Sequence, residues 1–400
     1  MLTAADCARV LHRFASSERE PSLKSFEATS IFRHFSTTEG CNHCMRLLLI
    51  GPLPPPLGGA TVLFQQLAKG VTTVPGVNML MIDTSRKGKM GFLVNALHAL
   101  QGFALLVIKA PQVDIISFHA SIRGAVTFGP FVWFVSKLFH KPFVFRGFGG
   151  FFGEWHKGAM PSIKFLFNRT ILRSDIVLLE THASVDYFRS FSRGKLMWFP
   201  NARPAAMLGP RNHASQHKAR RFVFVGHVIP GKGIHQIIEA GERLSDEIVI
   251  DIYGPLMEGI KSELFLGKRV RYRGVIEPDQ VVCTISQYDV LLLPTCLKTE
   301  GYPGVILEAY SVGVPVIASR IGAIAEIVDN TSGILVEPQS VDQLLGAMQT
   351  LMSSSQRMED LRKGAATMAQ KFSTEVWTVN FLEICHTLSA RTATPGRSST

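Results

Sequence analysis

Residues 291–317 read Leu291-Leu-Leu-Pro-Thr-Cys-Leu-Lys-Thr-Glu300-Gly-Tyr-Pro-Gly-Val-Ile-Leu-Glu308-Ala-Tyr-Ser-Val-Gly-Val-Pro-Val-Ile317. The apolar run that ends at Pro294 is typical of a central strand in a parallel sheet. Pro303 stands where a helix would begin, because its fixed φ suits the first turn. Glu308 then lies about one and a half turns into that helix, at ~3.6 residues per turn. The stretch predicts a strand, a loop that carries Glu300, a helix and a second strand.

The two carboxylates of this stretch predict a ligand. Glu300 lies in the loop at the edge of the sheet, Glu308 on the helix behind it, and the backbone amides of Gly304 and Val305 open toward the same cleft. Carboxylates bind sugar hydroxyls, and the amides at a helix N-terminus bind phosphate. Together they suit a sugar nucleotide. The spacing alone equally allows two surface glutamates on a capped helix.

On both sides of this stretch, apolar strands alternate with helix-length segments, which predicts parallel sheets with helices on both faces. The fold class is therefore α/β, with two doubly wound Rossmann-like domains. Eleven strands are expected, at residues 46–50, 77–82, 115–118, 143–145, 176–179, 222–225, 248–253, 270–272, 290–293, 315–318 and 334–336. The predicted parts are an extension at 1–44, a first domain at 45–203, a linker at 204–220, a second domain at 221–372, and a C-terminal helix with a frayed tail at 373–400.

A second candidate site opens the second domain. The strand at 222–225 ends at Gly226, and His227-Val-Ile-Pro-Gly-Lys232-Gly233 leads into a helical run. Ligands of such sheets bind beyond the carboxyl ends of the strands. Lys232 is therefore placed to meet a phosphate. A lysine in a solvent-facing loop would give the same pattern.

The positive charge is concentrated in one part of the chain. Of the net charge of +11, residues 46–200 carry all, with 17 Lys and Arg against 6 Asp and Glu. Such an excess needs an anionic partner. No nucleic-acid-binding module accompanies it, so a phosphorylated or otherwise anionic acceptor and an acidic membrane surface are the expected partners. Six scattered cysteines make no disulfide framework, which favours a reducing compartment, the cytoplasm.

Residues 1–44 differ from the rest of the chain. They are polar and lack the apolar core of a signal peptide, so we interpret them as a poorly ordered extension, with Met45 as the functional start. Cys41 and Cys44 have the spacing of metal ligands, but no second pair completes a zinc site. The sequence contains no Asp-x-Asp cation motif, and we predict no bound metal.

Two long apolar stretches, at 92–110 and 122–139, raise the question of a membrane. Both are interrupted by polar residues, and both alternate with predicted strands of one sheet, which disfavours membrane-spanning helices. Two interpretations remain. The stretches form ordinary core helices, or one of them lies with its apolar face on the bilayer beside the basic surface, as a peripheral membrane protein does.

Several motifs occur together and in register. The pair of glutamates lies in Glu300-Gly-Tyr-Pro-Gly-Val-Ile-Leu-Glu308-Ala, with seven residues between them. This block resembles the signature of retaining GT-B glycosyltransferases of family four. The similarity extends to Gly313-Val-Pro-Val-Ile-Ala-Ser, Gly322-Ala-Ile-Ala-Glu326-Ile-Val, Gly333-Ile-Leu-Val, Gly226…Lys232-Gly233, Pro54-Pro-Pro-Leu-Gly58-Gly59, Asp114-Ile-Ile-Ser-Phe-His119 and Pro200-Asn201.

The resemblance implies a role for each matching residue. Glu308 would hold the donor ribose, Glu300 the hydroxyls of the transferred sugar, and Lys232 the diphosphate. Gly58 and Gly59 would let backbone amides approach that phosphate from the other domain, which glycine permits because it lacks a Cβ. His119 would lie near the sugar and the acceptor; the alternative is a buried, hydrogen-bonded histidine.

One residue departs from the family pattern. The family usually has arginine directly after the glycine that is Gly226 here, and this chain has His227. Arginine is permanently charged and grips phosphate with two hydrogen bonds, whereas histidine is half neutral near pH 6.5. Arg146 and Arg320 are possible substitutes.

The implied reaction is transfer from a nucleotide-diphosphate sugar, most often a UDP-sugar in this family, without a bound cofactor. Its acceptor would be a glycan or a lipid-linked glycan in bacterial-type surface polysaccharide synthesis. The acceptor would attack on the face of the sugar from which the phosphate departs, and the leaving phosphate would take the acceptor's proton. Two alternatives remain: a GT-B nucleotide-sugar epimerase, whose family lacks the Glu300–Glu308 block, and a non-catalytic membrane- or partner-binding descendant in which His227 marks decay.

Overall fold

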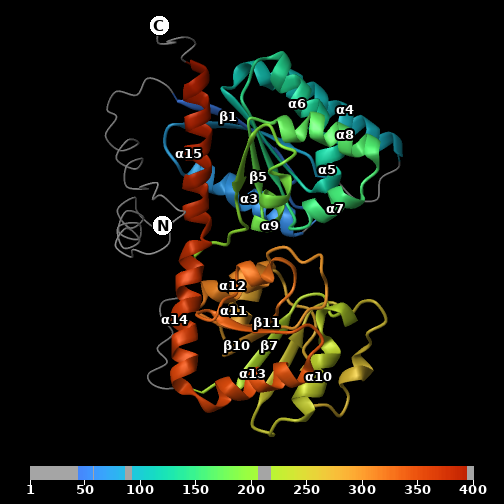
Figure 1. Cartoon of the computed structure of the whole chain (residues 1–400), viewed down its shortest axis with the longest axis vertical. Helices are drawn as coiled ribbons and strands as arrows, with labels where there is room; N and C mark the ends of the chain where they lie inside the picture. Colours follow the sequence, from blue (N-terminus) through green and yellow to red (C-terminus); the bar gives the residue numbers. More distant parts are fainter. Residues whose placement is uncertain (1–43, 57, 86–91, 206–217, 394–400) are drawn as a thin grey trace.

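The computed structural model describes residues 44–56, 58–85, 92–205 and 218–393, and the predictions for residues 1–43 and 394–400 and for most of the linker lie outside them. Two α/β units follow one another along the chain (Figure 1). Each is built on a six-stranded parallel sheet. The predicted fold class is therefore confirmed.

The first sheet has the order β2-β1-β3-β4-β5-β6. Its strands are β1 (Met45–Gly51), β2 (Val77–Asp83), β3 (Ile115–Ala120), β4 (Phe143–Gly147), β5 (Ile176–Leu179) and β6 (Lys195–Trp198). The sequence does not predict β6. This strand pairs only with β5 and is part-exposed, so it lacks the continuous apolar run of a central strand.

Helices cover both faces of the first sheet. One face packs against the helices that follow β2, β3, β4 and β5. The other face packs against α3 and the C-terminal helix. The helices of this unit are α3 (Gly59–Thr72), α4 (Phe92–Lys109), α5 (Ile122–Thr127), α6 (Gly129–Leu138), α7 (Phe152–Gly158), α8 (Pro161–Arg169) and α9 (His182–Phe188), with the 3₁₀ turns η1 (Ala110–Gln112) and η2 (Ile171–Arg173).

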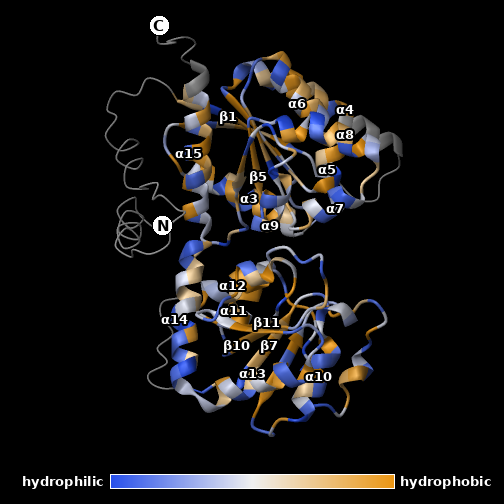
Figure 2. Ribbon diagram, viewed as in Figure 1, coloured by the Kyte–Doolittle hydropathy of each residue, from blue (hydrophilic) through white to orange (hydrophobic). Residues whose placement is uncertain are grey.

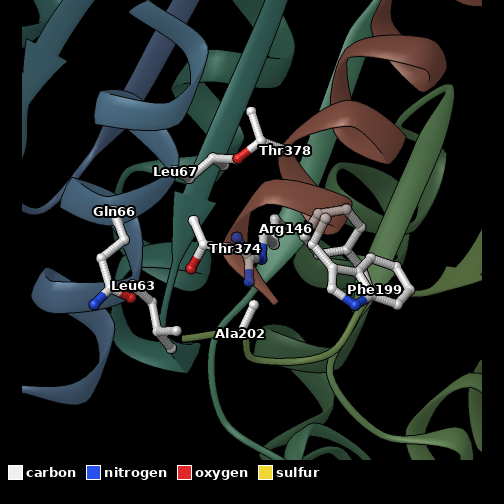
Figure 3. A pocket seen from close by; sticks show the side chains of 9 residues that line it. Leu63, Gln66, Leu67, Arg146, Phe199, Ala202, Thr374 and Thr378 are labelled. Atoms are coloured by element: carbon white, nitrogen blue, oxygen red, sulfur yellow. The ribbon is translucent and has the colours of Figure 1, made fainter. Parts of the chain in front are cut away.

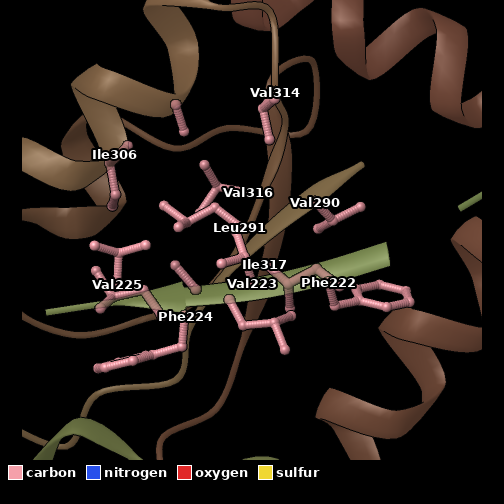
Figure 4. Packing of buried hydrophobic residues seen from close by; sticks show 14 of the residues in the cluster. Phe222, Val223, Phe224, Val225, Val290, Leu291, Ile306, Val314, Val316 and Ile317 are labelled. Atoms are coloured by element: carbon pink, nitrogen blue, oxygen red, sulfur yellow. The ribbon is translucent and has the colours of Figure 1, made fainter. Parts of the chain in front are cut away.

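The second sheet has the order β12-β11-β10-β7-β8-β9. Its strands are β7 (Arg221–Val225), β8 (Val249–Tyr253), β9 (Val270–Tyr272), β10 (Val290–Leu293), β11 (Val316–Ser319) and β12 (Gly333–Val336). The apolar side chains of β7, β10 and β11 interleave at its centre (Figure 4). Each of its strands was predicted to within one residue at each end, because central parallel strands are buried on both faces.

The last of the remaining helices returns the chain to the first unit. They are α10 (Ile234–Glu242), α11 (Val281–Ile285), α12 (Gly304–Ser311), α13 (Val341–Ser353), α14 (Ser355–Lys371) and α15 (Thr374–Ala393), with the 3₁₀ turns η3 (Pro230–Lys232), η4 (Ser262–Phe265) and η5 (Gly322–Glu326). Helix α14 packs on the second unit, whereas α15 packs on α3 of the first (Figure 1). None of the helices in the described ranges is long and apolar enough to cross a membrane.

Candidate functional site

Lys232 and Glu300 form an ion pair at the carboxyl edge of the second sheet. Lys232 ends the turn η3, and Gly233 follows with a positive φ of 80°. A Cβ at Gly233 would collide with the carbonyl of Pro294, so only glycine lets the turn lie this close to the end of β10. Both charged side chains are largely buried. The structure therefore brings together two residues that lie far apart in the sequence.

Glu308 lies on the same side of α12 as Gly304, one helical turn further along. Its Oε1 accepts a hydrogen bond of 2.8 Å from Nε of Arg203. The guanidinium of Arg203 also packs against Gly304, leaving no room for a Cβ there. Helix α12 begins after Pro303, and no side chain caps its first turn. The amides of Gly304 and Val305 thus lie at an uncapped N-terminus, where anions are stabilised.

The glycine loop of the first unit leads into α3. Gly58 is the residue before the helix, and its amide donates to Oγ1 of Thr61 at 3.0 Å. Among the residues that the structure describes, no heavy atom beyond the neighbouring chain lies within 4 Å of a Cβ placed on Gly59. The first turn of α3 is thus free of close contacts from that part of the chain, as the approach of a ligand to the backbone requires.

His119 lies in the interior of the first unit. Its ring is fully buried between Phe64, Phe148 and Phe381, and its Nε2 lies 2.8 Å from Oγ of Ser117. Burial, with the charge of Arg146, holds the pKa of His119 well below its usual value, so the ring is neutral. These contacts fit the alternative of a buried, hydrogen-bonded histidine, and a role in catalysis stays a prediction.

The three residues considered around the missing arginine lie in different surroundings. His227 is exposed after β7. Arg320 is exposed and forms an ion pair with Glu337 at 3.4 Å. Arg146 is buried, lies over the rings of Phe148 and Phe199, and donates to the carbonyl of Pro200 at 3.2 Å.

Burial lowers the pKa of Arg146 to about 9, although the nearby Glu180 opposes that shift. The small pocket beside Arg146 lies between α3, β4 and α15 and is lined by none of the predicted donor residues (Figure 3).

The loops at the carboxyl ends of the two sheets meet at Glu180, the residue after β5. Its Oε1 accepts from the amide of Tyr302 at 2.7 Å, and its Oε2 from the amide of Gly149 at 2.8 Å. Burial raises the pKa of Glu180, and these two amide bonds with the charge of Arg146 counter that shift. Gly150 and Gly301 pack backbone against backbone beside it. The loop of Glu300 therefore rests directly on the first unit.

A second contact between the units involves Tyr302 and Glu326. The hydroxyl of Tyr302 donates to Oε2 of Glu326 at 2.6 Å and accepts from Nε1 of Trp198 at 3.0 Å. Glu326 also accepts a hydrogen bond of 2.8 Å from the amide of His182, the first residue of α9. A carboxylate from the second unit thus caps a helix of the first, at the end where its negative charge is stabilised.

Arg203, Glu180 and Glu326 were not predicted as site residues. Glu180 follows a buried strand just as His119 ends one, so the same rule could have found it. Arg203 follows the Pro200-Asn201 boundary, as the last residue of the predicted first domain, where the sequence gives no sign of a site. No group of His, Cys, Asp and Glu that could hold a metal occurs among the described residues, which include Cys44 but not Cys41.

In the comparison with protein families, the match lies in the second unit. Residues 210–368 match the family model of glycosyl transferases group 1. The sulfoquinovosyl transferase SQD2 of Arabidopsis thaliana is 26% identical over 155 residues, which are 38% of this chain and 30% of that protein. The D-rhamnosyltransferase WbpZ of Pseudomonas aeruginosa is 27% identical over 150 residues, 36% of this chain and 39% of WbpZ. The matches thus span well under half of either relative.

Solved structures resemble the whole two-unit arrangement. HepE of Anabaena, in complex with UDP, superposes with a TM-score of 0.63 at 17% identity, covering 86% of this chain and 100% of HepE. The lipopolysaccharide outer core galactosyltransferase WaaB, in its apo form, gives a TM-score of 0.61 at 16% identity, covering 86% and 99%. The fold is therefore GT-B, two Rossmann-like domains joined by a linker and a returning C-terminal helix.

Proposed function

We propose that this protein transfers a sugar from a nucleotide-diphosphate sugar to a glycan or lipid-linked glycan acceptor, with retention of configuration, in the synthesis of a surface polysaccharide. One observation carries the proposal. Lys232 pairs with Glu300 at the carboxyl edge of the second sheet, and the loop of Glu300 leads into the uncapped start of α12, one turn before Glu308. The match of residues 210–368 to glycosyl transferases group 1 supports it.

The roles follow from the chemistry of the groups. The reaction separates a positively charged, oxocarbenium-like sugar from an anionic leaving group, and cations and helix amides fixed near that group lower the barrier. We assign the diphosphate to Lys232 and to the amides of Gly304 and Val305. Gly58 and Gly59 would supply amides from the other domain. No cofactor is required in this scheme.

The two glutamates bind the uncharged parts of the donor. Glu300 lies beside Lys232, so a sugar attached to the diphosphate would meet its carboxylate. Glu308 lies one turn along α12, and we assign the ribose to it. We propose UDP as the nucleotide, and the complex of HepE with UDP is compatible with this choice.

The acceptor would come from the side of the first domain. The excess of positive charge in residues 46–200 suits an anionic acceptor, such as a lipid-linked glycan at the inner face of the plasma membrane. The protein would then be cytoplasmic and peripheral to that membrane.

The test is turnover of a panel of sugar nucleotides by the purified protein, with release of nucleoside diphosphate as the readout. We expect release with one donor, and a loss of on the order of a hundredfold or more in rate for Lys232→Met and for Glu300→Gln. Lys268→Met, in an exposed loop, is the matched control. The anomeric configuration of the product, read by NMR, tests retention. Unchanged turnover in both site variants would refute the assignment.

A further inference from the structure

The outer side of the first domain exposes large apolar side chains on three neighbouring helices. Helices α4, α6 and α8 pack their inner sides on one core, and Phe103 of α4 meets Phe131 of α6 with ring centroids 5.9 Å apart. Figure 2 shows all three helices rich in hydrophobic residues. We call six of their exposed apolar residues the outer apolar face: Ile108, Phe131, Phe134, Leu138, Phe165 and Leu166.

Helix α6 shows why this face needs an explanation. Its inner side is formed by Val132 and Val135, which are buried against the sheet. Phe131, Phe134 and Leu138 follow the helical spacing on the other side and are 53%, 57% and 56% exposed. A surface helix of a soluble domain carries polar residues there. Because α6 is apolar on both sides, its outer side needs an apolar environment other than the core of the domain.

The helices that build the face carry charges of one sign. Helices α4, α5, α6 and α8 contain no Asp or Glu, and they carry Lys109, Arg123, Lys137, Lys164 and Arg169. Lys137 is paired at 3.4 Å with Asp175, the residue before β5. Lys109 and Lys164 are the chain neighbours of the exposed Ile108 and Phe165, and Arg169 lies over the ring of Phe165 at 5.0 Å.

A like-charged cluster lies at the end of α8. Partial burial lowers the pKa of Arg173, and the nearby charges of Arg193 and Arg169 lower it further. Repulsion between cations is relieved when an anion joins them. Apolar aromatic rings bordered by such cations are the composition of helices that lie in the interface of an anionic bilayer.

We propose that the outer apolar face docks on an anionic lipid bilayer. Phe131, Phe134 and Phe165 enter the region between headgroups and acyl chains, while Arg123, Arg169 and Arg173 meet the lipid phosphates. Juxtamembrane cations add attraction that depends on the salt concentration. This inference does not depend on the sugar transfer proposed above, because it concerns a face built by other residues.

The test is co-sedimentation of the full chain with vesicles of phosphatidylglycerol and phosphatidylcholine, and with vesicles of phosphatidylcholine alone, across a salt series. We expect strong binding to the anionic vesicles at low salt that weakens as the Debye length falls from about 30 Å at 0.01 M to about 3 Å at 1 M. The double variant Phe131→Ser/Phe134→Ser should bind at least about tenfold more weakly.

Matched controls separate this face from general hydrophobicity. Leu266 is 73% exposed and Val275 is exposed on the second domain, so Leu266→Ser/Val275→Ser should bind like the wild type. Circular dichroism checks that each variant is folded. Arg123→Gln/Arg169→Gln, which keeps every apolar residue, gives a second measurement and should lose anionic binding several-fold.

Three results would overturn the proposal. These are equal binding of the Phe131→Ser/Phe134→Ser variant and the wild type, equal binding to anionic and neutral vesicles, and a dimer of the wild type that the same double variant abolishes. The last result, measured by sedimentation velocity, would assign the face to a second copy of the chain. Failure of sugar-nucleotide turnover, measured without vesicles, would leave the docking result unaffected.

Discussion

Glu308, the carboxylate that we assign to the donor ribose, is held by a cation from the segment that joins the two domains. Arg203 binds Glu308 at 2.8 Å, and both side chains are largely shielded from water. Removing one partner of such a pair leaves a charge without compensation, which costs more than the pair itself contributes. Arg203 therefore holds the side chain of Glu308 in place, as a positioning residue.

We predict that Arg203→Met raises the KM for the sugar nucleotide about tenfold, with a smaller change in kcat. The ribose is remote from the reacting bond, so the lost interaction affects ground state and transition state alike. Arg203→Lys should restore part of the affinity, because lysine keeps the charge but not the guanidinium geometry. Arg220→Met removes the exposed pair of Arg220 with Glu247 and serves as the control. A lower KM in Arg203→Met would instead show that Arg203 competes with the ribose.

At the scale of elements, α15 joins the end of the chain to the first domain. Phe381, Leu382 and Cys385 are buried in the core that contains α3. Beside them lies Glu383, 7% exposed, whose Oε1 has no partner in the described part of the chain. Burial raises the pKa of Glu383 to about 7. An acid with a raised pKa costs stability once it ionises.

The sign of the resulting pH dependence follows from the bound protons. Between the unfolded pKa of 4.5 and the folded value of about 7, the folded state holds a proton that the unfolded state has lost, so the contribution of Glu383 to stability falls as the pH rises. We predict that Glu383→Gln stabilises the protein by ~1–3 kcal/mol at pH 8 and by much less at pH 4.5. Urea unfolding of both proteins at the two pH values measures this. An equal difference at both pH values would contradict a titrating Glu383.

At the scale of the whole molecule, the two domains touch through the loops that carry the candidate site. Glu180 of the first domain binds the amide of Tyr302, and Gly150 packs on Gly301. A Cβ at Gly150 would lie 2.6 Å from Cα of Gly301 and 2.9 Å from Cγ2 of Thr181. Neither atom belongs to the far end of a flexible side chain. The domain contact therefore depends on the absence of a side chain at Gly150.

We predict that Gly150→Ala separates the two loops and lowers the rate of sugar-nucleotide turnover at least about tenfold, because small displacements of positioned groups are costly. The strain of an extra methyl group should destabilise the contact by ~1–3 kcal/mol. Small-angle X-ray scattering should report a larger radius of gyration. Gly158→Ala, where no atom of the described ranges lies within 4 Å of the new Cβ, is the matched control. Wild-type dimensions and turnover in Gly150→Ala would show that the contact is dispensable.

The sequence by itself determined the two parallel sheets, because a strand buried on both faces is a local apolar run that can be read without its neighbours. The same locality placed Lys232 and Glu300 at strand ends. Strand β6 was missed because its four residues, Lys195–Trp198, are exposed or part-buried and form no such run, and its pairing with β5 is its main support.

Only the tertiary structure decided which residues meet. In the sequence, Arg203 stands at the boundary between the first domain and the linker. In the structure its guanidinium packs against Gly304 and binds Glu308, 105 positions away. Glu180 and Glu326 likewise gain their roles from the opposite domain. The interior position of His119 depends on Phe381, contributed by a helix from the far end of the chain. Such contacts are set by how the domains and α15 pack, and packing is a property of surfaces that no local pattern contains.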